Sequence, residues 1–299
     1  MTLDLVTVLG PTATGKTSIA ALLAKDFKGE IISADSRQVY KGMDIGTGKD
    51  LIEFQKLDIK YHLIDIAEPT EEYNLFLFTK DFNSFYDEIK TRNKLPIMVG
   101  GTGLYLSAIL QSYNLPEIPD REEFKLLNEL TTEQLKQKLV ELKPKLHNVT
   151  DFSNKERIIR AIVIERSRGE AITIPSKINS LNIGIKVARE ENKKRITERL
   201  KKRLNSGMIE EVEELLRKGI SKEKLEYFGL EYKFVSQYIE GKLNYNDMFQ
   251  KLNSSIHSFA KRQMTWFRKM EREGVVINWF HPENYPEIRS YVASRFSDG

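Results

Sequence analysis

The fold is decided by the stretch LDLVTVLGPTATGKT, residues 3–17. Its first part, residues 3–9, is an apolar, β-branched run typical of a buried strand. The remainder, residues 10–17, matches the pattern G-x-x-x-x-G-K-[ST] of a phosphate-binding loop. The apolar spacing from Thr17 to Lys25 then predicts a helix. A strand, a glycine-bounded loop and a helix in this order indicate an α/β protein.

The loop has the chemistry of a polyphosphate site. Its glycines let successive backbone N–H groups point at phosphate oxygens, and the following helix presents its positive end. Lys16 would place an ammonium group on the phosphates, and Thr17 would offer a hydroxyl to Mg²⁺. We therefore predict polyphosphate binding by eight consecutive residues: Gly10, Pro11, Thr12, Ala13, Thr14, Gly15, Lys16 and Thr17.

Further strands and helices alternate along the chain. The best strand candidates are Gly29–Ala34, Leu95–Val99, Asn182–Ala188 and Val275–Phe280. They predict a P-loop parallel sheet with helices on both faces. We divide the chain into a first part of this core (1–115), a mostly helical insertion (116–181) with a helix starting near Thr131, and a return to the core (182–299). The last segment holds helices at about 191–218 and 245–272, a last strand and a polar tail.

Composition excludes several chemistries. The chain has 299 residues, no Cys and four His, so disulfides, cysteine-ligated zinc and thiol catalysis are excluded. The sequence contains no apolar run of membrane-spanning length and no secretory signal, so we expect a cytoplasmic protein without membrane contact. The net charge of +4 says little, but residues 186–203 contain nine Lys/Arg and three Glu. This run suits phosphate contacts with nucleic acid, and a solvated helix face with internal ion pairs is the alternative.

Asp35 follows the second predicted strand, so it should project beside the phosphate loop. It could bind Mg²⁺ through water or accept a proton, although a helix-capping role is also open. The Asp that ordinarily helps bind Mg²⁺ in P-loop NTPases is missing after Leu95–Val99, which ends in Gly100-Gly101-Thr102. Asp65 is the only substitute, and a turn or cap is the better interpretation of it. The phosphate loop therefore serves a task other than ordinary nucleotide hydrolysis.

Five motifs, in order along the chain, resemble the bacterial tRNA dimethylallyltransferases. The resemblance implies transfer of a dimethylallyl group from dimethylallyl diphosphate to N6 of the adenosine immediately 3′ of the anticodon in tRNA. It also implies release of diphosphate, a requirement for Mg²⁺, contact with the anticodon stem-loop and, we expect, a monomer. The motifs are GPTATGKT (10–17), SADSRQVYKGMDIGTGK (33–49), GGTGLY (100–105), RIIRA (157–161) and AKRQMTWFR (260–268).

The resemblance also assigns residues. It implies Asp35 as the base that deprotonates N6, Lys16 and Thr102 as further catalytic residues, and Thr17 as the metal ligand. We interpret the glycine-rich stretch 42–49 as a flexible loop near the site, and Trp266 and Phe267 as core. The residues implied to contact tRNA are Asp35, Ser36, Arg37, Gln38, Thr102, Glu156, Arg157, Ile158, Ile159, Arg160, Lys261, Arg262 and Gln263.

The sequence departs from the family pattern at two places, and two alternative functions remain open. In residues 228–233 the Tyr and Gln usual in the family are absent, so these positions receive no role, and Phe124 stands where an Arg is expected. The first alternative is a P-loop small-molecule or nucleotide kinase, which would bind ATP. The second is a non-enzymatic RNA-binding protein that uses the loop as a nucleotide switch. Neither gives Asp35 and Thr102 a joint task.

Overall fold

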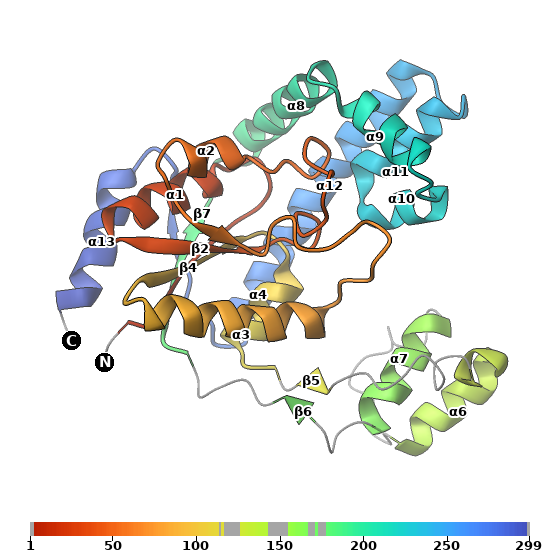
Figure 1. The fold of residues 1–299 in the computed structure, drawn as a ribbon, viewed down its shortest axis with the longest axis horizontal. Coiled ribbons are helices and arrows are strands. Elements are labelled where there is room, and N and C mark those ends of the chain that lie inside the picture. The colour runs from red at the N-terminus through yellow and green to blue at the C-terminus, as the bar shows by residue number, and fades with distance from the viewer. Residues whose placement is uncertain are drawn as a thin grey trace. The chain divides into compact units, whose positions relative to one another are not determined.

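The computed structural model describes residues 3–113, 115–116, 126–142, 155–166, 171–172 and 178–297. The chain divides into two units (Figure 1). Unit 1 comprises Met1–Gln111 and Lys177–Gly299, and unit 2 comprises Ser112–Ser176. The division falls earlier at both ends than the insertion predicted at 116–181. Phe124 lies outside the described residues. Among those described, no helix combines the length and the apolar character needed to cross a membrane.

Unit 1 contains a six-stranded sheet whose neighbouring strands are all parallel. The strand order is β3-β2-β4-β1-β7-β8, so β4 lies between β1 and β2 although it follows them in sequence. The predicted α/β class with a parallel P-loop sheet is confirmed. The strands are β1 (Leu5–Leu9), β2 (Gly29–Ala34), β3 (Tyr61–His62), β4 (Leu95–Gly100), β7 (Ser180–Ile185) and β8 (Asn278–Phe280).

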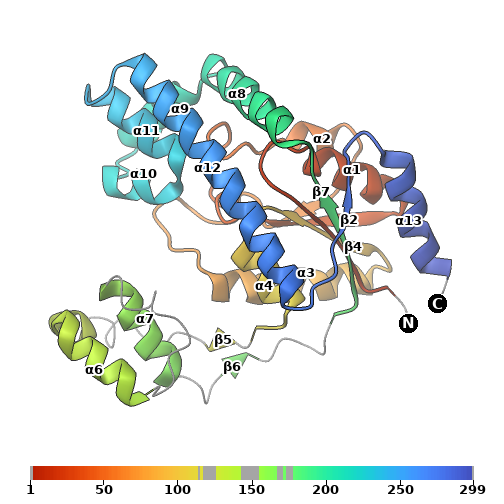
Figure 2. The same cartoon turned by 180° about the vertical axis from the view of Figure 1, so that it is seen from behind.

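Helices cover both faces of the sheet (Figures 1 and 2). In β1, Val6 and Val8 pack on one face with α1 (Lys16–Asp26), whereas Leu5 and Leu9 pack on the other. This alternation is the two-residue period of a strand buried on both sides. The first face also carries α2 (Leu51–Gln55) and α13 (Tyr285–Ser297), and the second carries α3 (Leu75–Thr91), α4 (Gly103–Leu110) and α12 (Tyr245–Arg272).

The basic region after β7 forms several helices rather than one. The helix expected at about 191–218 is interrupted at Gly207, which has φ +100° and starts a new helix. Such a backbone conformation suits glycine because it has no side chain. The resulting helices are α8 (Arg189–Asn205), α9 (Met208–Arg217), α10 (Lys222–Phe228) and α11 (Leu230–Ile239), followed by α12.

Unit 2 has its own small core. Its helices α6 (Thr132–Leu142) and α7 (Lys155–Arg166) bury Leu135 against Ile158 and Ile159, and β5 (Leu115–Pro116) pairs antiparallel with β6 (Ala171–Ile172). The Thr131 hydroxyl accepts a hydrogen bond from the Gln134 backbone N–H, and the Gln134 side-chain oxygen accepts one from the Thr131 backbone N–H. This capping box lies at the predicted helix start.

The predicted polar tail is wrong. Residues 285–297 form α13, in which Ile288 and Val292 are fully buried in the core beneath the sheet. The two apolar residues are four positions apart, so they share one face of the helix. Among the described residues of the helix, only these two are buried, so the apolar stripe is short.

Substitution of Val292 tests whether α13 is part of the core. Val292→Ala should lower the free energy of unfolding by about 2 kcal/mol, because it removes buried methyl groups and leaves a cavity. Val276→Ala is the matched control, since Val276 is 71% exposed and should change stability by less than about 0.5 kcal/mol. Urea denaturation measures both, and equal effects would show that α13 is not packed as described.

Candidate functional site

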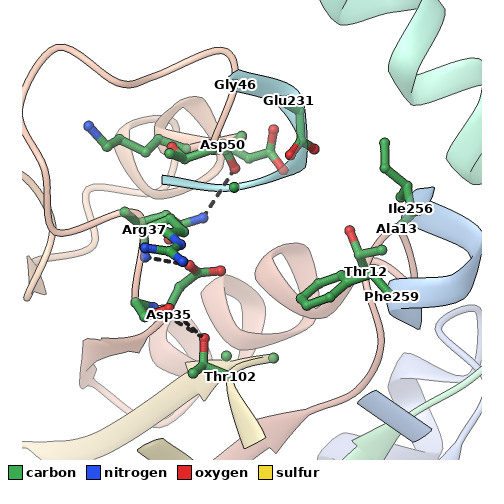
Figure 3. Close-up of a pocket in the computed structure, with 18 of the residues that line it drawn as sticks. Thr12, Ala13, Asp35, Arg37, Gly46, Asp50, Thr102, Glu231, Ile256 and Phe259 are labelled. Carbon is green, nitrogen blue, oxygen red and sulfur yellow. Dashed lines mark hydrogen bonds between the residues drawn. The ribbon is translucent and has the colours of Figure 1, made fainter. Parts of the chain in front are cut away.

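Three neighbouring strands end at one edge of the sheet and gather the predicted site residues there. Leu9 of β1 and Ala34 of β2 both pair with Gly100 of β4. The phosphate loop follows β1, Asp35 follows β2, and Thr102 follows β4, so all three meet in one cavity of about 1030 Å³. Figure 3 shows Asp35 and Thr102 on one side of this cavity and the phosphate loop's Thr12 on the other.

The phosphate loop has the backbone of an anion-binding turn. Gly10 has φ +154°, and a Cβ there would lie 2.3 Å from the carbonyl oxygen of Ile185. Gly15, with φ +85°, caps α1 without a side-chain hydrogen bond to the helix N–H groups. Lys16, Thr17 and the N-terminal end of α1 therefore face the cavity, as the sequence pattern predicts.

Lys16 is held inside the loop. Its Nζ donates to the carbonyl oxygen of Pro11 at 2.7 Å. Burial and, to a smaller extent, the nearby positive charge of Arg199 lower the pKa of Lys16 to about 8. Both effects disfavour the ammonium form, so a bound anion would raise the pKa again.

Gln263 of α12 connects two edges of the site. Its Oε1 accepts the N–H of Thr12 at 2.9 Å, and its Nε2 donates to the carbonyl oxygen of Gly101 at 2.8 Å. The side chain is 7% exposed and lines the cavity, where it holds the phosphate loop against the turn after β4. The tRNA contact implied for Gln263 stays a prediction. Lys261 and Arg262 are exposed, and Arg262 also lines the cavity. Phe267 is fully buried, and Trp266 is partly buried beside the cavity.

Asp35 is oriented by its own turn. Its Oδ1 accepts the N–H of Arg37 at 2.9 Å, and the N–H of Ser36 donates to Oγ1 of Thr102 at 3.1 Å (Figure 3). Asp35 is partly exposed and lines the cavity. Gln38 accepts from the hydroxyl of Ser33 at 3.2 Å. The polar residues after β2 therefore form a fixed group at the strand end.

The stretch 42–49 is tied down, which differs from the flexible loop expected. Glu211 of α9 accepts the consecutive N–H groups of Asp44, Ile45 and Gly46 at 2.7–2.9 Å, together with the hydroxyl of Tyr232 at 2.8 Å. The buried ammonium group of Lys49, at the end of this stretch, donates hydrogen bonds to Asp44, to Asp65 and to the carbonyl oxygen of Tyr40. The carbonyl oxygen of Gly48 in this loop accepts a hydrogen bond from the Gln38 side-chain amide. Asp65 thus serves this loop and does not line the cavity.

Part of the basic run on α8 faces the cavity. Arg199 donates to Asp50 at 2.9 Å and to the hydroxyl of Thr12 at 3.3 Å, so it joins the loop after β2 to the phosphate loop. Arg203 donates to Glu231 at 3.3 Å. Burial lowers the pKa of Arg203 to about 10 and raises the pKa of Glu231. On the same helix, Lys193 pairs with Glu190, and Arg195, which also lines the cavity, pairs with Glu191, as the alternative of internal ion pairs predicts.

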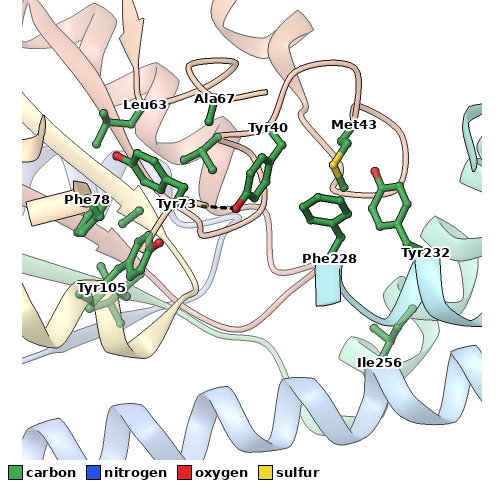
Figure 4. Packing of buried hydrophobic residues seen from close by; sticks show 14 of the residues in the cluster. Tyr40, Met43, Leu63, Ala67, Tyr73, Phe78, Tyr105, Phe228, Tyr232 and Ile256 are labelled. Carbon is green, nitrogen blue, oxygen red and sulfur yellow. Dashed lines mark hydrogen bonds between the residues drawn. The ribbon is translucent and has the colours of Figure 1, made fainter. Parts of the chain in front are cut away.

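Sequence reasoning missed the contribution of residues 226–233, which all line the cavity. Phe228 explains their position, because its ring is buried between Tyr40, at 4.8 Å between ring centroids, and Tyr232, at 6.2 Å (Figure 4). This contact joins α10 and α11 to the segment after β2. The only signal in the sequence was the departure from the family pattern at this place.

In unit 2, the implied tRNA contacts divide into two groups. Glu156, Arg157 and Arg160 lie on α7, and the placement of their side chains lies outside the described part of the structure. Ile158 and Ile159 are buried in the core of the unit, so the prediction that they contact tRNA is not supported. Their apolar side chains stabilise the helix pair instead.

The donor set of the cavity fits Mg²⁺. Thr17 supplies a hydroxyl and Asp35 a carboxylate to the same space, and phosphate oxygens and water commonly complete such a site. Within the described ranges, no cluster of three or more Asp, Glu or His side chains could hold a metal without a substrate.

A parallel sheet with a phosphate loop and a carboxylate at the ends of its strands defines an α/β protein of the P-loop type. The profile of the family described as IPP transferase matches residues 38–270, and that of isopentenyl transferase matches residues 3–64. The chain belongs to the IPP transferase family.

Individual relatives agree over nearly the whole length. The chain is 50% identical to tRNA dimethylallyltransferase 1 of Geotalea uraniireducens, over 96% of this chain and 95% of the relative. It is 50% identical to tRNA dimethylallyltransferase 2 of Syntrophotalea carbinolica, over 93% and 94%. The crystal structure of the tRNA isopentenylpyrophosphate transferase of Bacillus halodurans is similar, with 32% identity, a TM-score of 0.73 and coverage of 99% and 97%.

The pKa of Lys16 predicts how diphosphate binding depends on pH. Because a bound anion favours the ammonium form, binding above pH 8 takes up a proton, and affinity should fall by up to about tenfold per pH unit. Titration calorimetry with dimethylallyl diphosphate from pH 7 to about 9.5 measures this. Lys16→Arg is the control, because arginine stays charged and the ligand's own titration is common to both proteins. An identical pH slope in the two proteins would contradict the assignment.

Glu211 predicts a local effect on the loop. Glu211→Gln places an N–H₂ group against backbone N–H donors, so the free energy of unfolding should fall by about 1–3 kcal/mol. Hydrogen exchange at the amides of residues 44–46 should accelerate. Glu213→Gln, at an exposed site of the same helix, should change neither quantity. Unchanged exchange in Glu211→Gln would show that this carboxylate does not hold the loop.

Proposed function

We propose that the cavity holds dimethylallyl diphosphate and the N6 amine of an adenosine at the same time. The acceptor is the adenosine immediately 3′ of the anticodon in tRNA, and diphosphate is released. The observation that carries this proposal is that the phosphate loop, after β1, and Asp35, after β2, open into one cavity from the two strands that flank β4. Its volume is at the upper end of that of small-ligand sites, which suits two ligands.

The diphosphate lies in the phosphate loop in this proposal. Lys16, the N-terminal end of α1 and Arg199 surround that space with positive charge. The C–O bond of the donor breaks with its electron pair going to the diphosphate, so these groups stabilise charge as it develops. Thr17 would hold Mg²⁺, which when bound neutralises part of the charge on the leaving group.

The dimethylallyl tail requires an apolar wall next to the phosphates. Ala13, Ile256 and Phe259 form one, beside Thr12 and opposite Asp35 (Figure 3). We place the tail there, because its reactive carbon then points across the cavity towards the acceptor. Phe259 is 39% exposed, so its ring has surface to bury against the ligand.

The acceptor side belongs to Asp35. The lone pair of the adenine amine is delocalised into the ring, so removal of a proton during attack assists the reaction. As the N–C bond forms, the N6 proton passes to the Asp35 carboxylate. Thr102 keeps the turn in place through its hydrogen bond from the Ser36 N–H, and it lines the same space. The adenine reaches the site by leaving the stack of its loop.

A choice between donors tests the proposed function. With tRNA and Mg²⁺, label from dimethylallyl diphosphate should reach the RNA, and label from γ-labelled ATP should not. Asp35→Asn keeps the size and the hydrogen bond to Arg37 but cannot accept the proton, so transfer should fall by about a hundredfold or more while RNA affinity persists.

Two results would contradict the proposal. Transfer of phosphate from ATP without prenylation would favour the kinase alternative. Undiminished transfer by Asp35→Asn would remove Asp35 as the base. Dependence on Mg²⁺, the monomeric state and the cytoplasmic location stay predictions.

A further inference from the structure

We propose that Tyr227 and Arg37 form a stacking platform for a nucleobase next to the reacting adenosine. The inference rests on the proposed function and adds an RNA subsite to it. The partner is a single-stranded RNA loop, recognised through the π-face of one base. Neither residue of the pair has a role in catalysis in this proposal.

Tyr227 is an exposed ring in a cavity lined by fixed side chains. It is the penultimate residue of α10, it lines the cavity, and it is 51% exposed, whereas the adjacent Phe228 is 1% exposed. Phe228 anchors this end of the helix in the core, and the two rings meet edge to face with centroids 6.0 Å apart. Tyr227 is therefore held in place by its neighbour while its own ring stays available. A large exposed aromatic ring at a cavity is typical of a binding surface.

The guanidinium of Arg37 lies over this ring, 4.8 Å from its centroid. Arg37 is two residues after Asp35, and its N–H donates to the Asp35 carboxylate. The platform is thus joined directly to the turn that carries the proposed base. A guanidinium plane backed by an aromatic ring has little freedom left to lose when a base stacks on it.

The surroundings favour RNA as the occupant. The Lys224 ammonium lies 5.7 Å from the Tyr227 centroid and is fixed by a 3.1 Å hydrogen bond to the carbonyl oxygen of Glu71. Two cations beside one exposed ring combine phosphate attraction with a stacking surface, which is the usual combination in single-strand RNA sites. The apolar wall around Phe259 lies across the cavity from Arg37, so the platform is on the acceptor side (Figure 3).

Three variants and one control test the platform. Tyr227→Ala and Tyr227→Leu should weaken binding of the anticodon stem-loop by about tenfold and leave the KM for dimethylallyl diphosphate unchanged. Tyr227→Phe keeps the ring and should retain most of the RNA affinity. Tyr245→Ala is the matched control, since Tyr245 is a 43% exposed tyrosine at the start of α12 that does not line the cavity.

A spectroscopic probe separates stacking from a merely structural role. A stem-loop with 2-aminopurine on either side of the target adenosine should lose fluorescence on binding to the wild type and to Tyr227→Phe, in at least one of the two positions. That quenching should disappear with Tyr227→Leu at saturating protein. Wild-type affinity and quenching in Tyr227→Leu, or a loss confined to kcat or to the donor KM, would overturn the proposal. Failure of the wild type to prenylate RNA would overturn the proposed function instead.

Discussion

The parallel pairing of β4 with both β1 and β2 is the constraint on which the site depends. Because Gly100 pairs with Leu9 on one side and Ala34 on the other, three strands end at the same level. The phosphate loop, Asp35 and Thr102 are far apart in sequence, yet this register brings them to one cavity. The phosphate loop can then hold a leaving group while Asp35 accepts a proton from the attacking group, without any rearrangement of the sheet.

Side chains from the helices after β7 fix the loops that surround the cavity. Gln263 holds the phosphate loop to the turn after β4, and Glu211 holds the loop after β2 through three backbone N–H groups. Arg199 then connects these two loops through Thr12 and Asp50. All three side chains come from the C-terminal half of the chain, so the cavity forms only when both halves of unit 1 are folded together. Such fixed surroundings reduce the reorganisation needed during the reaction.

Local sequence patterns predicted those parts of the fold and the site that are determined by residues close together in the sequence. The phosphate loop and the strands on either side of it have strong spacing signals, and Asp35 could be placed because strand ends share an edge. Long-range partners left no such signal: nothing near Glu211 or Gln263 in sequence indicates which backbone groups they bind. Residues 226–233 were missed because their position depends on the packing of Phe228 against Tyr40. The helix at 285–297 was missed because, among its described residues, only Ile288 and Val292 are buried.

We propose that one cavity brings a diphosphate donor to the amine of one adenosine in an RNA loop. Mass spectrometry of an anticodon stem-loop after incubation with the protein, dimethylallyl diphosphate and Mg²⁺ tests it most directly. We expect a single added dimethylallyl group on N6 of the adenosine 3′ of the anticodon, and no addition when that nucleotide is guanosine. An unmodified stem-loop, or addition to the guanosine-containing RNA, would contradict it.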